Sequence, residues 1–155
     1  MNGNDQLKDI MKLGVSQLSS ECIQAVGVII YSIETNQWLF VQRADPKTAG
    51  LWGIPGGKIK NNETFNEAIT RECFEELGII IDLSITIPIQ KYVNNSFSYH
   101  TFLVIIEKPF LPKLNNEHLG FAWMNYGYYP KPLHPGVFET ITSDFVREKM
   151  ESIIE

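Results

Sequence analysis

The sequence predicts an α/β fold in which a mixed β-sheet is sandwiched between helices. Three observations lead to this prediction: β-rich runs lie on both sides of a central helical segment, that segment carries start and stop signals, and an amphipathic helix follows the last β-rich run. The chain has 155 residues and is 44% hydrophobic, which is enough for one sizeable core. We therefore expect one domain over residues 21–155, preceded by an N-terminal extension over residues 1–20.

The N-terminal extension is predicted to be helical, because residues 5–18 carry apolar side chains at helical spacing. Gly14 weakens that helix. Three interpretations are open: the segment covers one end of the sheet, contributes to a homodimer, or frays as a terminal helix.

The candidate strands are runs rich in β-branched and aromatic residues. The first two are separated by a short polar segment and form a hairpin candidate, and a loop with Pro46 and Gly50 follows them. Pro88 interrupts a later run, which predicts a strand and a turn there. In chain order, the candidate strands are residues 23–31, 38–42, 79–89, 98–107 and 121–124.

The central helix is predicted over residues 65–77. Thr64 fits an N-cap, and Glu67 three residues later completes a capping box. Gly78 stands where a left-handed glycine ends a helix. The apolar stripe that packs this helix against the sheet consists of Ile69, Cys73 and Leu77.

The last predicted element is a C-terminal amphipathic helix. A stiff turn with Pro130, Pro132 and Pro135 precedes it. The apolar residues that mark its buried face are Val137, Phe138, Ile141, Phe145, Val146 and Met150.

Three glutamates share one face of the central helix, because Glu72, Glu75 and Glu76 stand at i, i+3 and i+4. Like charges at i, i+4 cost roughly 0.2–0.5 kcal/mol per pair, and a divalent cation would remove that cost. Carboxylates are hard oxygen ligands that suit Mg²⁺ or Mn²⁺. For three glutamates alone, an acidic solvated helix face is the simpler interpretation.

Charge and composition exclude several classes of function. The net charge of −5, without a basic run, disfavours binding to nucleic acid, which depends on clustered Lys and Arg. No apolar run approaches a membrane span, and the N-terminus lacks the apolar core of a secretory signal. Two cysteines, Cys22 and Cys73, make a disulfide framework improbable. We expect a cytoplasmic protein that binds a small phosphorylated molecule through a cation.

Residues 57–79 read GKIKNNETFNEAITRECFEELGI. The spacing is Gly57, five residues, Glu63, seven residues, Arg71-Glu72, an apolar position, any residue, Glu75-Glu76, any residue, Gly78 and an apolar position. This pattern resembles the Nudix box, the motif of hydrolases that act on nucleoside diphosphates linked to another moiety. Cys73 departs from the usual Leu, Ile or Val, but a free cysteine packs as a small hydrophobe. The resemblance covers residues 23–151 and implies a Nudix-type α/β/α sandwich.

The resemblance implies a set of metal ligands. Glu72 and Glu76 are the leading candidates, Glu75 follows them, and Glu117 is a further candidate. The carbonyl of the residue before the box glycine is often a further ligand in the family, and here that residue is Gly56. The implied cofactor is Mg²⁺, with Mn²⁺ as a substitute.

Other residues are implied to position these ligands or to bind substrate. Arg71 and Glu63 fit an orienting role, because an arginine fork can hold a carboxylate and aim it at a metal. The alternative for Arg71 is a surface ion pair with the glutamate one turn further on. Paired glycines let the backbone approach a phosphate, which assigns Gly57 and the adjacent Lys58 to substrate binding. Arg43, at the end of the second strand, often meets substrate in the family.

The segment before Trp123 offers candidates for two chemistries. In MutT-like members a loop glutamate occurs six residues before such a tryptophan, which is Glu117 here. In GDP-mannose mannosyl hydrolases a catalytic histidine occurs five residues before it, which is His118. Three aromatic residues are candidates both for stacking on a base and for the core: Trp52, Tyr99 and Phe121.

The resemblance therefore predicts Mg²⁺-dependent hydrolysis of a phosphoanhydride bond in a nucleoside triphosphate, or in a nucleoside diphosphate linked to another moiety. The catalytic set is Arg71, Glu72, Glu75 and Glu117, with Glu117 or a helix glutamate as the base. One alternative is a GDP-sugar hydrolase that acts at the sugar carbon with His118 as base, although members of that group depart from the box. The other is a non-catalytic nucleotide-sensing module, which would normally lose a box glutamate.

Overall fold

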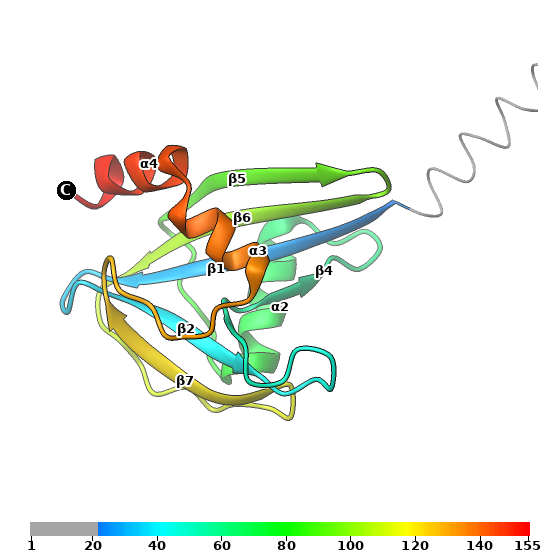
Figure 1. Cartoon of the computed structure of the whole chain (residues 1–155), viewed down its shortest axis with the longest axis horizontal. Helices are drawn as coiled ribbons and strands as arrows, with labels where there is room; N and C mark the ends of the chain where they lie inside the picture. Colours follow the sequence, from blue (N-terminus) through cyan, green and yellow to red (C-terminus); the bar gives the residue numbers. More distant parts are fainter. Residues whose placement is uncertain (1–21) are drawn as a thin grey trace, which may run out of the picture.

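The computed structural model describes residues 22–155 of the chain (Figure 1). The predicted N-terminal extension, residues 1–20 with the helix expected over residues 5–18, lies outside the described residues. The strands are β1 (Ile23–Ser32), β2 (Gln37–Arg43), β3 (Trp52–Gly53), β4 (Gly56–Lys58), β5 (Thr86–Asn94), β6 (Phe97–Ile106) and β7 (His118–Asn125). The helices are α2 (Phe65–Leu77), α3 (Pro135–Thr142) and α4 (Asp144–Ile154).

The strands form one mixed sheet, as predicted. Its main path runs β3-β2-β1-β6-β5, while β4 pairs with β1 and β7 pairs with β2. The central strands β1 and β6 are parallel, in register from Ile23 with Phe97 to Ser32 with Ile106. The other strand pairs are antiparallel.

Helices cover both faces of the sheet, which confirms the predicted sandwich. Helix α2 lies on one face, and α3 and α4 lie on the other (Figure 1). The central strand β1 supplies both cores, because its side chains alternate between the faces. Val28 and Ile30 join the core beneath α2, whereas Ile29 and Tyr31 join the core beneath α3 and α4. Burial on both faces explains why β1 is a nearly continuous apolar run.

Helix α2 has the predicted bounds and the predicted caps. The Thr64 hydroxyl accepts a hydrogen bond from the Glu67 amide at 3.1 Å, and the Glu67 carboxylate accepts one from the Thr64 amide at 3.4 Å. Gly78 ends the helix with φ 66°, in the left-handed region that favours glycine. Local sequence therefore determines both ends of the helix that carries the glutamates.

The strand expected over residues 79–89 lies further along the chain. Strand β5 begins at Thr86 and passes through Pro88, where the register shifts between Pro88 and Gln90. This strand is at the edge of the sheet, where a proline and a bulge are tolerated. The prediction that Pro88 marks a turn was therefore wrong, and β5 extends to Asn94.

The expected C-terminal helix is two helices. Ser143 ends α3 in an extended conformation, and its hydroxyl accepts a hydrogen bond from the Val146 amide at 3.4 Å to begin α4. The apolar pattern continues across this break, which is why the sequence read as one helix. Within residues 22–155, no helix combines the length and apolar character needed to cross a membrane.

The expected loop between β2 and α2 contains the short strands β3 and β4. Gly56 in β4 has φ 155° and lies so close to β1 that a Cβ atom there would overlap the carbonyl oxygen of Val26 and come within 2.9 Å of the Gly27 Cα. Only glycine permits this approach, because any side chain would push β4 away from β1.

We therefore expect Gly56→Ala to lower the free energy of unfolding by about 3 kcal/mol or more, from backbone overlap added to strain. Gly127→Ala is the matched control, since Gly127 also has a positive φ (93°) but nothing lies within 4 Å of its missing Cβ. That variant should lose about 1–2 kcal/mol. Urea unfolding followed by circular dichroism measures both, and equal losses would contradict the close approach.

Candidate active site

A cleft of about 1130 Å³ opens between the sheet and helix α3. Its walls come from the end of β2, from β4, from β5 and β6, from the start of β7, and from α3. Glu76 also reaches this cleft, although it belongs to α2 on the other side of the sheet.

Three carboxylates meet beside this cleft. Glu72, Glu76 and Glu117 each offer an oxygen, and these atoms all lie within 4.8 Å of one another. The first two stand one turn apart on the buried side of α2. Glu117 is distant from the two helix glutamates in the sequence, and the sheet brings it close to them. Strand β7 pairs with β2, and the Glu117 carbonyl accepts a hydrogen bond from the Ala44 amide at 3.0 Å.

The two helix carboxylates are buried, with residue exposures of 6% for Glu72 and 3% for Glu76. The Glu76 carboxylate accepts a hydrogen bond from the Gly56 amide at 2.9 Å. Burial raises the pKa of Glu76 to about 9, with the nearby Glu72 and Glu117 charges adding to the effect. Burial likewise raises the pKa of Glu72, despite its contact with Arg71.

Glu75 stands apart from this group of carboxylates. Its side chain is 46% exposed, and its contact is with Arg71, whose Nη1 lies 3.3 Å from the Glu75 carboxylate. The sequence placed all three glutamates on one face. In the structure Glu72 and Glu76 turn toward the sheet while Glu75 lies at the rim, and its role as a ligand or catalyst stays a prediction.

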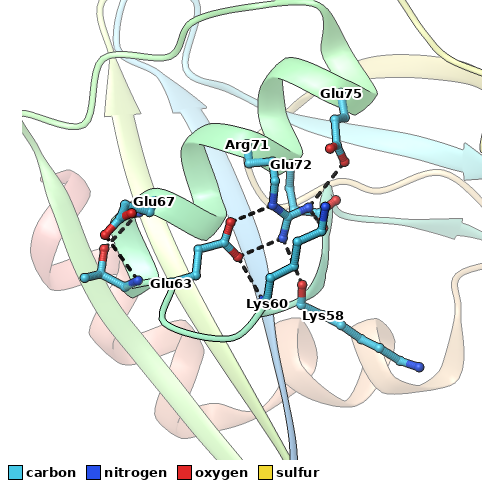
Figure 2. Close-up of polar contacts among 8 residues, drawn as sticks. Lys58, Lys60, Glu63, Glu67, Arg71, Glu72 and Glu75 are labelled. Carbon is cyan, nitrogen blue, oxygen red and sulfur yellow. Dashed lines mark hydrogen bonds and ion pairs between the residues drawn. The ribbon is translucent and has the colours of Figure 1, made fainter.

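Arg71 joins the box to the strand beneath it (Figure 2). Its Nε and Nη2 donate to the two oxygens of Glu63 at 2.6 and 2.9 Å, and its Nη1 donates to Glu72 at 2.8 Å. Nη2 also donates to the Lys58 carbonyl at 3.0 Å. Because of the Arg71 hydrogen bond, the pKa of Glu63 falls to about 2. This is the geometry expected of a side chain that fixes the aim of Glu72.

Gly57 and Lys58 lie on β4, which packs against α2, rather than along the cleft. A Cβ atom on Gly57 would overlap the Glu72 carboxylate, so this glycine provides the space in which that carboxylate sits. The Lys58 side chain is exposed and extends away from Arg71 (Figure 2). Neither residue lines the cleft.

Arg43 and His118 line the cleft next to Glu117. Arg43 Nε donates to the Asp45 carboxylate at 3.0 Å, and hydrogen bonds from Thr48 and Arg43 lower the pKa of Asp45 to about 2. His118 pairs with Arg43 as the first residue of β7. The strand was expected to begin at residue 121, which would have left His118 in the preceding loop. Burial lowers its pKa, and its Nδ1 is the one buried side-chain nitrogen or oxygen among residues 22–155 that lacks a hydrogen-bond partner.

The aromatic candidates separate into two groups. Tyr99 lines the cleft and leans over Gly27, where any Cβ would overlap its ring. Trp52 and Phe121 pack against the two cores.

Much of the cleft lining consists of residues that the sequence did not predict. His134 caps α3, because its Nδ1 accepts a hydrogen bond from the Gly136 amide at 3.1 Å, and both residues line the cleft. Gln90 and Tyr92 were missed because β5 was expected to end at residue 89. Their alternation with Lys91 along a strand is the signal that would have found them.

The sequence matches the family model of the NUDIX domain over residues 23–143. A dihydroneopterin triphosphate diphosphatase of Haemophilus influenzae is 30% identical over 66% of this chain and 73% of its own length. A putative 8-oxo-dGTP diphosphatase of Bacillus subtilis is 31% identical over 69% of each chain. The crystal structure of a MutT protein from Methanosarcina mazei has a TM-score of 0.64 and 23% identity, covering 86% of this chain and 96% of its own.

The family match spans most of the described residues, from β1 to the end of α3, and includes the cleft and the three carboxylates. Nudix hydrolases generally use a divalent metal, and the buried acidic group is compatible with one. The chain therefore belongs to the Nudix family, as a MutT-like hydrolase of pyrophosphate bonds in nucleotide derivatives.

Proposed function

We propose that the chain uses Mg²⁺ to hydrolyse a phosphoanhydride bond in a nucleoside triphosphate, or in a nucleoside diphosphate linked to another moiety. The observation that carries this proposal is the meeting of Glu72, Glu76 and Glu117 beside a cleft that also holds Arg43. The Haemophilus and Bacillus relatives are both named for triphosphate substrates, which favours the triphosphate class.

The cluster of three carboxylates is suited to bind a divalent cation. Buried carboxylates without a counter-charge are unfavourable, and the raised pKa of Glu76 expresses that cost. Three carboxylate oxygens within 4.8 Å form a hard, anionic donor set. Glu72, Glu76 and Glu117 would hold the ion. When bound, Mg²⁺ would neutralise the negative charge that builds on the phosphoryl oxygens during the reaction.

The side chains of the site divide the remaining tasks. Arg71 keeps the Glu72 carboxylate oriented, and the Gly56 amide does the same for Glu76. Arg43 supplies a fixed positive charge for a phosphate, because Asp45 holds its guanidinium in place. A carboxylate, from Glu117 or one of the helix glutamates, accepts the proton of the attacking water while the new phosphorus–oxygen bond forms and the bond to the bridging oxygen breaks.

His118 carries the second candidate function, attack of water at a sugar carbon of a GDP-sugar. The observation in its favour is its place in the cleft beside Glu117, with a lowered pKa that keeps the imidazole neutral near pH 7 and able to accept a proton. Retention of every glutamate of the box argues against this function.

We further propose that the substrate is a free nucleotide encountered in the cytoplasm. The net charge of −5 supports a free nucleotide over a nucleic acid, because it disfavours binding to a phosphate backbone. We also propose that the protein forms a homodimer to which the N-terminal extension contributes. The mass of the protein in solution tests this proposal.

A panel of nucleotides and nucleotide sugars, assayed with Mg²⁺ and with Mn²⁺ for release of phosphate, pyrophosphate and monophosphate, tests the proposal. In this assay we expect Glu76→Gln to lower kcat by about 100-fold or more, because it removes a ligand charge without changing shape. Glu148→Gln, the same change at an exposed position of α4, should keep wild-type activity. Wild-type turnover by Glu76→Gln at saturating Mg²⁺ would remove Glu76 from the site.

In the metal-free protein, Glu76→Gln should raise the free energy of unfolding at neutral pH by on the order of 1–3 kcal/mol. The pKa of Glu76 is raised from 4.5 to about 9, so the folded state keeps a proton that the unfolded state releases. Wild-type stability therefore falls as the pH rises from 4.5 toward about 9. The substitution should reduce that slope and leave the part that comes from the raised pKa of Glu72, and urea unfolding in a chelator at about pH 5.5 and about pH 8 measures it.

Glu75→Gln serves as the control for this measurement, because the Glu75 side chain is 46% exposed. Added Mg²⁺ should raise the melting temperature of the wild type and leave that of Glu76→Gln nearly unchanged. If the free energy of unfolding changed equally with pH in the wild type, Glu76→Gln and Glu75→Gln, ionisation of the buried Glu76 would be refuted as the cause of that change.

Hydrolysis in ¹⁸O water distinguishes Glu117 from His118. Attack at phosphorus places the label in a phosphate product, and Glu117→Gln then lowers kcat by about 10²-fold or more while His118→Ala changes it little. Attack at a sugar carbon places the label in the sugar and reverses the order of the two variants. We expect label in phosphate, and label confined to a sugar would overturn the proposed reaction.

A further inference from the structure

The cleft has two chemically different ends. Arg43 and Glu117 mark one end, at β2 and β7, whereas Gln90 lies on β5 at the opposite edge of the sheet. In the order β2-β1-β6-β5, strands β2 and β5 are three spacings apart, or about 14 Å at the usual strand separation. A substrate with its phosphates beside Arg43 therefore presents its other end to β5.

The β5 end of the cleft is lined by polar and aromatic side chains of β5 and β6. Gln90 pairs with Thr101 across the two strands, and Tyr92 pairs with Tyr99, so these four side chains share the face that looks toward α3. Two apolar side chains of α3, Val137 and Ile141, also line the cleft, and Val137 lies beside Gly53 of β3 rather than beside β5. The Gln90 side chain is partly exposed and lines the cleft.

The charges at this end disfavour a second phosphate group. Arg43 is the one arginine or lysine among the residues that line the cleft, and it belongs to the other end. Glu139 on α3 also lines the cleft and adds a negative charge to it. An uncharged, flat group fits these walls, because tyrosine rings stack on heterocycles and the amide hydrogen-bonds to their edges.

We infer that the β5 end binds the base of the substrate, and that Gln90 pairs with a lactam edge, meaning a ring N–H beside a carbonyl. A glutamine amide places an acceptor next to a donor, which complements that edge with two hydrogen bonds. Both substrates named for the Haemophilus and Bacillus relatives, a pterin and an oxidised guanine, carry a lactam edge. The inference rests on the proposed function and names the substrate class of the same site.

Binding of GMP, 1-methyl-GMP and ribose 5-phosphate, measured by calorimetry, tests this inference without any turnover. Methylation removes the ring N–H, and ribose 5-phosphate removes the base. We expect wild-type protein to bind GMP about tenfold or more tighter than the other two ligands, the effect of losing one to two hydrogen bonds. Gln90→Leu should weaken GMP binding about tenfold and leave ribose 5-phosphate within about twofold.

Gln24→Leu is the matched control, because Gln24 is exposed on β1 and lies outside the cleft. It should bind all three ligands as the wild type does. In Gln90→Leu, methylation of GMP should have little further effect, since the variant and the methyl group remove the same contact. Should Gln90→Leu not fold, the comparison of GMP with 1-methyl-GMP on the wild type still decides.

Equal binding of GMP, 1-methyl-GMP and ribose 5-phosphate by the wild type would overturn the inference. So would a loss in Gln90→Leu that is the same for all three ligands. Hydrolysis of GTP by the wild type is measured in parallel. Base-independent binding with normal hydrolysis contradicts the base site alone, whereas absent hydrolysis of every nucleotide tested contradicts the proposed reaction.

Discussion

Two carboxylates, those of Glu72 and Glu76, are buried where helix α2 packs on β1 and β4. That face of a helix is ordinarily apolar, because an unpaired buried charge costs far more than packing returns. The surrounding structure is arranged to accept them. Arg71 holds one carboxylate, the Gly56 amide holds the other, and Gly57 leaves room for the first. Arg71, Gly56 and Gly57 therefore allow the two glutamates to be buried and also fix the positions of their carboxylates.

The arrangement of strands gives Glu76 access to the opposite face of the sheet. Strand β1 pairs with β2 near its end and with β4 near its start. The sheet is therefore discontinuous beside β4, and Glu76 on α2 lines a cleft that α3 also lines. Small residues at Gly27 and Gly56 keep the backbones and the Tyr99 ring close together at this point. The three carboxylates therefore lie beside the cleft because the sheet is discontinuous at this point.

Local sequence signals predicted helix α2, which carries two of the three clustered carboxylates. Pairing between strands that are distant in the sequence determined which other residues reach the cleft. Thr64, Glu67 and Gly78 act within a few residues of the helix ends, so α2 was predicted residue for residue. Gln90 joined the cleft only because β5 continues past Pro88 at the sheet edge. That continuation depends on pairing with β6, which no local pattern reports.

Glu117 and Glu75 illustrate the same limit within the site. The spacing of Glu117 to Trp123 suggested its role, and the pairing of β7 with β2 brings it to the carboxylates. The i, i+3, i+4 spacing placed Glu75 with its two neighbours. Periodicity alone does not say which members of a face turn toward the sheet, and packing on β4 selected Glu72 and Glu76.

The parallel pairing of β1 with β6 also governs how the chain reaches its folded state. It joins Ile23 to Phe97, and the β2–β7 pairing joins Gln37 to Asn125, so much of the sheet requires closure of long chain segments. Helix α2 can form early from its own caps, but Glu117 reaches it only after β7 docks. Two of the three carboxylates are thus close together in the sequence, and the complete group of three exists only where the tertiary structure brings β7 to α2.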